Sequence, residues 1–402
     1  MKFVDFELTE YTKDYKYFEE YLEIRYKQDN VKRSVILKEA DIYQSAFSLA
    51  KKDGLGTHKK IVQKFEKYYG LEPIQPQPLQ ELNNHFNNLF IGTYYTNEEL
   101  AYNSYQEIMK LKNEFSNTYI SFLFDFFELF YISTTEQSTH QDNEKYINET
   151  FISLQKYKSI FPPKLLILLI LSGFSTDHLS ISDVNLEIAK LEELLSRYPK
   201  LKGYTYFKIG YIYHRLDHQE ASIHYLKESL TYLVQDINLQ RAKTIQSNLF
   251  VVYNSIGMLA KAKEQGETFL LYLNTVEGDE FLKWSINYNM ALISIQLENY
   301  KEALHYIETA YQYNNNKIAM ITLYMHICHT LKDNKKVKEL YFTNQELINN
   351  NSNPIYKLAI DLIYHKTIKY SRAQRNKEWK ELCLLLDKFK NYNVKYYIHK
   401  LK

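Results

Sequence analysis

The stretch between residues 43 and 52 gathers side chains that can contact a polyanion. It contains Tyr43, Gln44, Ser45, Ser48, Lys51 and Lys52. Gln and Ser side chains can pair with the edges of bases, and Ser also contacts phosphate oxygens. Lysines neutralise the phosphates of the backbone. The chemistry that this stretch favours is therefore recognition of nucleic acid by hydrogen bonds and charge.

Other groups of reactive side chains lack the pattern of a catalytic or metal-binding site. His214 and His218 lie one helical turn apart, which suits two metal ligands, but the sequence offers no third ligand nearby. The histidines and cysteine of segment 326–329 fit a partly buried helix. Residues 54–56 lack the preceding strand and the following Gly-Lys of a phosphate-binding loop. We therefore expect a protein that is not an enzyme and that needs no metal and no cofactor.

The residues around 43–52 can enter a groove only if a preceding helix holds theirs at a sharp angle. The spacing of apolar residues over 36–54 predicts such a pair of short helices. The side chains expected to face inward are Ile36, Leu37, Ala40, Ile42, Phe47 and Ala50. Asp41 stands in the turn, where an Asp tolerates left-handed backbone. Tyr43, Gln44, Ser45 and Ser48 are left on the outer side.

A third helix is expected to close this unit over residues 57–73, with Thr57 as its N-cap and Gly70 as its stop. From Lys32 to Lys67 the chain carries nine Lys or Arg residues against four acids, whereas residues 1–31 carry five against eight. The whole chain has a net charge of only +2. The basic charge is thus local to the candidate DNA-contacting region.

The composition predicts an all-α protein. Only 10 Gly and 7 Pro occur in 402 residues, which favours one helix after another with short joints. Two cysteines cannot form a disulfide framework, and the N-terminus lacks the apolar core of a signal peptide, which favours the cytoplasm. The longest apolar run, Leu165–Leu171, is far shorter than the roughly 20 residues that span a bilayer, so we expect no membrane partner.

A proline-rich stretch predicts the domain boundary. Residues 71–80 read LEPIQPQPLQ, and prolines so close together favour extended backbone over a regular helix. We therefore expect a domain over 1–70, a linker over 71–80 and a second domain over 81–402.

Beyond the linker the sequence repeats. Segments 206–230, 246–270 and 287–311 align as helical hairpins of similar length, and 321–341 follows as a fourth. We read the period as one hairpin for each repeat.

Small residues mark equivalent points in the second helices of these hairpins. Ser222, Ala262 and Ala303 are spaced by 40 and 41 residues, and Val337 follows in the fourth unit. They are expected where the two helices of a hairpin cross closely. The second hairpin departs on its first helix, where Phe250 replaces the usual small residue.

Residues 36–54 with the following helix resemble the helix-turn-helix domain of the lambda-repressor-like class. The resemblance implies a double-stranded DNA operator as partner, with Tyr43, Gln44, Ser45 and Ser48 near bases. The positions that would lie near phosphates are Arg33, Lys51, Lys52 and Lys59. The alternative is a purely structural role, in which these helices form a capping bundle with a solvated lysine face and do not bind DNA.

The hairpins resemble tetratricopeptide repeats, best in the third, where Ala291, Tyr300, Ala303 and Ala310 stand in family positions. This resemblance implies a right-handed α-superhelix whose concave face holds peptides or partner helices. A helix-turn-helix followed by such repeats resembles the peptide-pheromone receptors of Gram-positive bacteria and their phages (the Rap, NprR, PlcR, PrgX, Rgg and arbitrium-receptor types). It implies a cytoplasmic, homodimeric transcription factor that is switched by a short signalling peptide.

The same resemblance implies peptide-binding residues. Such receptors often carry an asparagine on the inner helix that bonds the peptide backbone, and Asn248 and Asn289 match that position. The first repeat departs, with Lys208 there. Its inner helix also carries the candidate groove residues Phe207, Tyr211 and His214.

Two other functions fit the same architecture. A Rap-like receptor would bind and inhibit a protein partner through its N-terminal helices, and Gln44 and Ser45 would then be incidental. A plain helical-repeat adaptor would bind neither peptide nor DNA.

Overall fold

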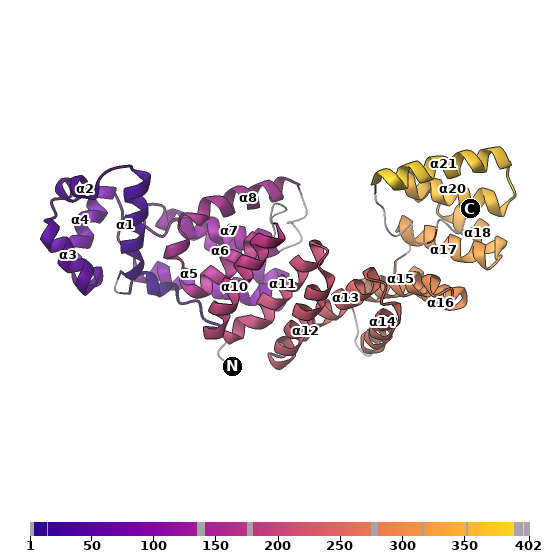
Figure 1. Ribbon diagram of the computed structural model, residues 1–402, viewed down its shortest axis with the longest axis horizontal. Coiled ribbons are helices and arrows are strands. Elements are labelled where there is room, and N and C mark those ends of the chain that lie inside the picture. The colour runs from indigo at the N-terminus through magenta and orange to yellow at the C-terminus, as the bar shows by residue number, and fades with distance from the viewer. Residues whose placement is uncertain are drawn as a thin grey trace. The chain divides into compact units, whose positions relative to one another are not determined.

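The computed structural model describes residues 4–13, 15–134, 141–174, 180–274, 280–314, 317–350, 353–389 and 397. Within these ranges the regular elements are helices and none is a strand, which confirms the all-α prediction (Figure 1). The chain forms two compact units, residues 1–245 and 246–402. This division falls elsewhere than the predicted linker, so the functional boundary at 71–80 stays a prediction.

The first unit contains α1 (Lys16–Gln28), α2 (Arg33–Glu39), α3 (Gln44–Asp53), α4 (Lys59–Tyr69), α5 (Pro76–Tyr94), α6 (Glu98–Lys110), α7 (Phe122–Thr134), α8 (Gln141–Gln155), α9 (Pro163–Gly173), α10 (Ile181–Arg197), α11 (Lys202–Arg215) and α12 (Gln219–Gln235). Helix α13 (Leu239–Ser255) begins in the first unit and ends in the second. The second unit continues with α14 (Leu259–Asn274), α15 (Glu280–Gln296), α16 (Tyr300–Tyr313), α17 (Ile318–Thr330), α18 (Asn334–Thr343), α19 (Gln345–Asn350), α20 (Pro354–Thr367) and α21 (Arg372–Phe389).

The second half of the predicted linker is helical. Helix α5 begins at Pro76, so residues 70–75 separate it from α4, which ends at Tyr69. Pro76 and Pro78 lie in the first turn of α5, where the missing N–H groups would have no partner within the helix in any case. The prolines therefore start a helix, and the expected extended linker over 71–80 was wrong for its second half.

The N-terminal residues pack on α5 rather than on the predicted DNA-contacting helices. The Phe6 N–H donates to Asn87 Oδ1 (3.1 Å) and the Leu8 N–H to Asn83 Oδ1 (2.6 Å). The Phe6 ring also meets Phe86 edge-on, with centroids 5.1 Å apart. Residues before α1 thus complete the surface of α5.

A cluster of aromatic rings joins the N-terminal helices to the rest of the first unit. Tyr119, which precedes α7, is 3% exposed and packs on Phe18 and Tyr21 of α1, with centroids 5.1 and 5.7 Å apart. Its hydroxyl donates to the Tyr11 carbonyl. Helix α1 and the residues before it are therefore packed against the region that precedes α7.

The predicted hairpins form, as α11–α12, α13–α14, α15–α16 and α17–α18. The small residues predicted at their crossings, Ser222, Ala262, Ala303 and Val337, are all fully buried. The Ser222 hydroxyl donates to the Gly210 carbonyl on the facing helix (2.8 Å). The tetratricopeptide-like packing expected from the sequence is confirmed.

The second hairpin accommodates Phe250 by exchanging large and small residues between its helices. In the first hairpin Gly210 faces Leu226, and a Cβ on Gly210 would lie 2.8 Å from Leu226 Cγ. In the second, a Cβ on Gly266 would lie 2.7 Å from Phe250 Cε2. The bulky side chain has moved from the second helix to the first, and glycine has moved the other way.

The hairpin turns share one backbone conformation. Asp217, Gly257, Glu298 and Lys332 all have φ between 60° and 73°. In each turn the next N–H donates back to a carbonyl of the preceding helix's last turn, as His218 N–H does to Tyr213 O (2.9 Å). This is a Schellman ending, which favours glycine, yet the chain uses glycine at one of these four positions.

Ile237, between α12 and α13, should be the most strained of these endings. It has φ 57°, although branching at Cβ disfavours left-handed backbone. Ile237→Gly should raise the free energy of unfolding by about 1 kcal/mol, because the left-handed conformation costs an L-residue roughly 1–2 kcal/mol. Urea denaturation measures the change. The reverse substitution at a glycine turn, Gly257→Ile, should destabilise; an equal sign for both changes would refute the explanation.

Candidate functional site

The turn between α2 and α3 has the predicted left-handed residue. Asp41 has φ 53°, and the Ile42 N–H donates to the Leu37 carbonyl at 2.7 Å. Lys64 of α4 donates to the Asp41 carbonyl and to its carboxylate, the latter at 2.8 Å. This hydrogen bond and the Lys64 charge lower the pKa of the Asp41 carboxyl. Helix α4 therefore pins the turn.

The inner faces of α2 and α3 pack as the sequence predicted. Ile36, Leu37, Ala40, Ile42, Phe47 and Ala50 are all buried. Phe47 meets Phe65 of α4 edge-on, with centroids 5.5 Å apart. Large buried side chains of this kind each contribute about 1.5–3 kcal/mol, so α3 is held firmly by one face.

The C-terminal end of α4 agrees with the sequence prediction, and its N-terminal end does not. Gly70 ends the helix with φ 65°, as expected. The N-cap is His58, not Thr57. Thr57 instead ends a short 3-10 turn, Leu55–Thr57, one residue before the cap position, and its hydroxyl donates backward to the Gly54 carbonyl at 2.8 Å.

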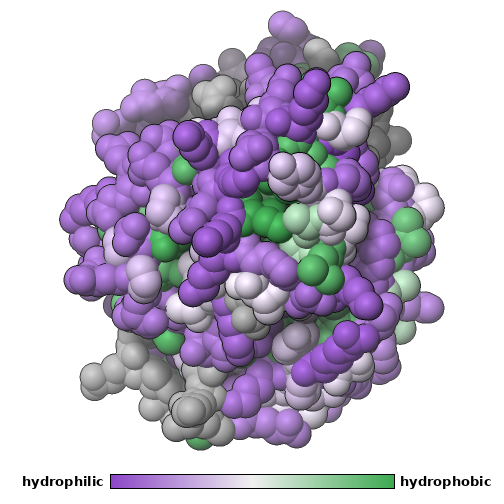
Figure 2. All heavy atoms as spheres, turned by 90° about the vertical axis from the view of Figure 1, so that its left-hand side faces the viewer, coloured by the Kyte–Doolittle hydropathy of each residue, from purple (hydrophilic) through white to green (hydrophobic). Residues whose placement is uncertain are grey.

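The outer side of α3 is exposed. Tyr43 is 79% exposed, and Gln44, Ser45 and Ser48 are exposed with it. No side chain caps the N-terminus of α3. Figure 2 shows the molecule from the side of the N-terminal helices, where the surface is mostly hydrophilic with apolar side chains exposed in places.

Two of the four basic side chains predicted near phosphates already have partners on α1. Arg33 Nη2 donates to both carboxylate oxygens of Glu23 (2.5 and 2.7 Å). Lys51 Nζ lies 2.6 Å from Glu19 Oε1 and 3.2 Å from Glu23 Oε1. Lys52 and Lys59 are exposed, and within the described residues they have no ion pair. Glu19 and Glu23 are spaced to share one helix face, a signal that sequence reasoning passed over.

The partners of Glu23 outweigh its burial. Burial alone would raise the pKa of its carboxyl, but the hydrogen bonds from Arg33 and Lys51 lower it overall. Because the pKa is lowered on folding, these ion pairs stabilise the fold at neutral pH, and their contribution is lost as the pH falls through the carboxyl's titration.

Glu23→Gln should release Arg33 toward DNA, whereas Lys51 keeps its closer partner, Glu19. We expect tighter binding to duplex DNA of any sequence, and a slope of log K against log[salt] that is steeper by about 1, since each phosphate contact adds roughly 0.9. Fluorescence anisotropy in a salt series measures both. Asp29→Asn, which removes an acid paired with Arg25 (3.7 Å), is the matched control. Identical slopes for the two variants would contradict the assignment.

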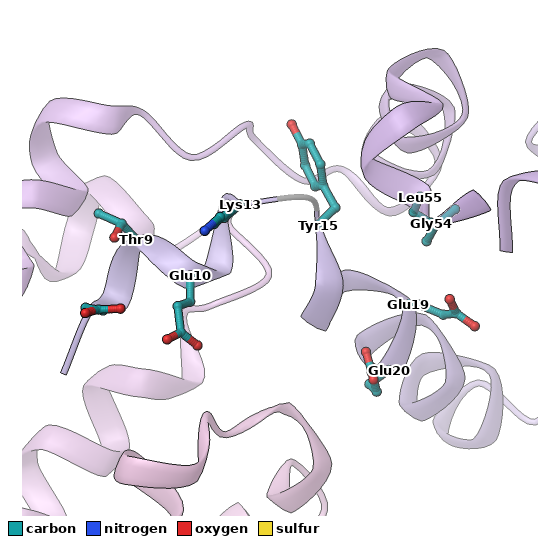
Figure 3. A pocket seen from close by; sticks show the side chains of 9 residues that line it. Thr9, Glu10, Lys13, Tyr15, Glu19, Glu20, Gly54 and Leu55 are labelled. Carbon is teal, nitrogen blue, oxygen red and sulfur yellow. The ribbon is translucent and has the colours of Figure 1, made fainter. Parts of the chain in front are cut away.

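An acidic pocket of about 700 Å³ lies beside these helices (Figure 3). Its walls are Glu7, Thr9, Glu10, Lys13, Tyr15, Glu19, Glu20, Gly54 and Leu55. Carboxylates repel phosphate, so this pocket marks a side of the N-terminal helices that disfavours DNA. Within the part of the chain that the structure describes, no cluster of His, Cys, Asp and Glu side chains could hold a metal ion.

The candidate peptide-contacting residues of the first repeat share a face of α11. Phe207 and His214 are half-buried and Tyr211 is 49% exposed. His214 Nδ1 lies 2.8 Å from Gln219 Oε1. The Arg241 guanidinium lies 4.9 Å from the centroid of the Phe207 ring. One side of this face is thus anchored by α13 and the other is open.

The candidate asparagines lie in the second unit. Asn289 of α15 is half-buried and donates from Nδ2 to the Ser285 carbonyl at 2.9 Å, so one donor is used within its own helix. Asn248 of α13 is half-buried as well, and its side-chain amide has no hydrogen bond among the described residues. Both amides retain groups that a ligand can bond.

Comparison with solved structures finds proteins of similar fold. No family model matches the sequence, and no curated protein matches it. The apo form of the quorum sensor NprR from B. thuringiensis shares 14% identity over 80% of this chain and 97% of NprR, with a TM-score of 0.58. NprR with its cognate peptide NprX covers 81% and 97%, with 13% identity and a TM-score of 0.51. Apo RapI covers 76% and 86%, with 11% identity and a TM-score of 0.61.

The chain has a fold similar to those of NprR and RapI.

The likeness to NprR and Rap confirms, at the level of fold, the resemblance predicted from sequence. At such low identity it carries over no individual residue. Among the described residues, every helix is too short or too polar to span a bilayer.

Three features of the structure are not predicted by the sequence. Val35 and Leu49 are 42% and 53% exposed, although they are apolar. The α1 carboxylates pair with predicted DNA-contacting cations. Lys208, which stands where the later repeats carry asparagine, is half-buried beside Arg241, and burial lowers its pKa to about 7.

Proposed function

We propose that this chain is a cytoplasmic, DNA-binding transcriptional regulator that is switched by a short signalling peptide bound to the concave face of its helical repeats. The observation that carries the proposal is α3, which is buried on one face and presents Tyr43, Gln44, Ser45 and Ser48 on the other. The likeness to NprR in complex with its cognate peptide supports the peptide part.

In this proposal α3 enters the major groove. Gln44, Ser45 and Ser48 contact base edges, and Tyr43 stands at the start of the helix beside them. Lys52 and Lys59 contact phosphates directly. Arg33 and Lys51 contact phosphates only if they give up their ion pairs with Glu19 and Glu23. The carboxylates of α1 therefore weaken the binding of DNA of any sequence.

The peptide lies along the inner helices of the repeats. Asn248 and Asn289 bond its backbone through their amides, as a neighbouring strand would. Phe207, Tyr211 and His214 are the proposed peptide-contacting residues of the first repeat, on α11. The protein acts as a homodimer, because two copies of a small module read two half-sites one or more helical turns apart. The peptide then acts by favouring one arrangement or oligomer over another.

A Rap-like receptor for a protein partner is the second candidate. The observation that favours it is the exposure of large apolar side chains on the N-terminal helices: Val35, Tyr43 and Leu49. Pairing of Arg33 and Lys51 with α1 carboxylates points the same way. The likeness to RapI is as good as that to NprR, and it does not choose between them.

Fluorescence anisotropy with DNA that flanks the chain's own gene tests the proposal. The control is a shuffled duplex of equal length and composition, in salt from roughly 50 to 200 mM. We expect tighter binding to the native DNA at every salt concentration and a fall in affinity as salt rises. Equal affinity for both duplexes, or no binding, would favour the protein-partner receptor.

A further inference from the structure

Lys208 occupies, in the first repeat, the position of Asn248 and Asn289 in the next two. The spacing from Lys208 to Asn248 is 40 residues and from Asn248 to Asn289 is 41, the same as between the buried small residues of these hairpins. On α11 it lies three residues before Tyr211, so the two share the partly open face of that helix. A cation therefore stands where the other repeats present an amide.

The surroundings of Lys208 use only part of its hydrogen-bonding capacity. Its Nζ donates to the Ser133 carbonyl near the end of α7, at 3.3 Å, and this is its only hydrogen bond among the described residues. An ammonium group has three donors. Lys208 thus keeps donors for another acceptor.

The neighbouring cation, Arg241, is held in place by hydrogen bonds and ring contacts within the first unit. Arg241 is 7% exposed, and its Nε donates to the Tyr94 carbonyl at 2.9 Å while Nη2 donates to the Thr93 carbonyl. Its guanidinium lies over the rings of Tyr204 and Phe207 (5.3 and 4.9 Å). These contacts close the C-terminal end of α5, so Arg241 is fixed in place as a positive charge beside Lys208.

Within the described residues neither cation has a carboxylate partner. Burial is the main cause that lowers the pKa of Lys208 to about 7, and the charge of Arg241 is the second. Burial likewise lowers the pKa of Arg241. A buried guanidinium and a half-buried ammonium that lack a carboxylate partner among the described residues are costly, and an anion beside Lys208 would lower that cost.

We propose that Lys208, with Arg241 behind it, receives a carboxylate of the bound peptide: its C-terminus or an Asp or Glu side chain. The proposal rests on the proposed peptide-receptor function and adds to it the chemical class and the direction of the ligand. Lys208 selects the charged group and so fixes which part of the peptide lies against α11.

The carboxylate should bind more weakly as the pH rises. Arg241 on α13 is the charged group that faces Lys208, and α7 presents the neutral Ser133 carbonyl. Because a bound carboxylate raises the pKa of the ammonium, binding takes up protons, and the affinity falls as the pH rises through the pKa of the free protein.

The test uses three libraries of random hexapeptides with the full-length protein. One has neutral side chains and a free C-terminal carboxylate, the second is the same library amidated, and the third is amidated with one Glu at a varied position. Affinity selection with mass spectrometry finds binders, and calorimetry then compares a chosen peptide with its partner that lacks the carboxylate. The variants are Lys208→Asn, which copies the other repeats, and Lys202→Asn as a control elsewhere on α11.

We expect the carboxylate to improve binding to the natural chain about tenfold or more, as charge-assisted hydrogen bonds do. Lys208→Asn should remove that preference, Lys202→Asn should keep it, and it should shrink between pH 6 and pH 8 (roughly one unit either side of neutrality). Selection from the first or the third library identifies the carboxylate as terminal or side-chain. Peptides that bind equally with and without a carboxylate would overturn this inference alone. No binding from any library would overturn the receptor function as well.

Discussion

A protein carrying Gln44→Ala and Ser45→Ala should lose its preference for its operator while remaining folded. Both side chains are exposed at the start of α3, so their removal leaves the buried face of Phe47 and Ala50 intact. A good base contact contributes about 1–3 kcal/mol of discrimination. We expect roughly a 10- to 100-fold loss of affinity for the operator, and little change for DNA of unrelated sequence.

Fluorescence anisotropy against the operator and a shuffled duplex measures both affinities. Ser34→Ala with Gln63→Ala is the matched control, because it removes the same two residue types from exposed positions on α2 and α4. The control should bind as the natural chain does. If the two double variants lose affinity equally, or neither does, α3 is not the helix that reads DNA.

Gly266→Leu should destabilise the second unit strongly. A Cβ there would lie 2.4 Å from Met290 Sδ and 2.7 Å from Phe250 Cε2, and both neighbours are fully buried. Overpacking of this kind costs about 1–3 kcal/mol, and leucine adds further atoms beyond Cβ. We expect the free energy of unfolding in urea to fall by about 3 kcal/mol.

A second substitution should relieve the destabilisation caused by Gly266→Leu, because the first hairpin has its glycine and its large side chain on the opposite helices. Phe250→Ala alone should also destabilise, by about 3–5 kcal/mol, through the cavity it leaves. The double variant Phe250→Ala/Gly266→Leu approximates the Gly210 and Leu226 pair of the first hairpin, so its cost should be well below the sum of the two single changes. Additive costs would show that the two positions do not compensate each other.

The sequence predicts those parts of the fold that local patterns determine. Apolar spacing alone identified the buried faces of α2 and α3, and Asp41 was correctly assigned to a left-handed turn. The period of the small residues located the hairpins, because close helix crossings require small side chains at a fixed point.

The rest depends on contacts between residues far apart in the chain. Pairing of Arg33 and Lys51 with α1 needs the angle between helices, which the spacing of charges does not contain. Phe6 packs on α5, some 80 residues along the chain, through side-chain amides that no local pattern marks. The prolines at the start of α5 predict a linker when they are considered locally. The φ angle that proline fixes suits both extended backbone and the first turn of a helix, so the local sequence cannot distinguish the two.

In the candidate site, too, some residues follow from local sequence patterns and others depend on contacts with distant parts of the chain. The outer residues of α3 followed from the inner ones, because a helix that buries one face exposes the other. Lys208 could not be interpreted from the sequence, because its meaning lies in Arg241, which comes from another helix, and in the lack of a counter-charge among the described residues.

If the proposed function is right, DNA binding and peptide binding are coupled. Fluorescence anisotropy at fixed salt measures the affinity of the full-length protein for its operator, with and without a saturating hexapeptide selected from the libraries. We expect the peptide to change the dissociation constant for DNA severalfold or more, and operator DNA to change the dissociation constant for the peptide by the same factor. Identical DNA affinity with and without bound peptide would contradict this coupling.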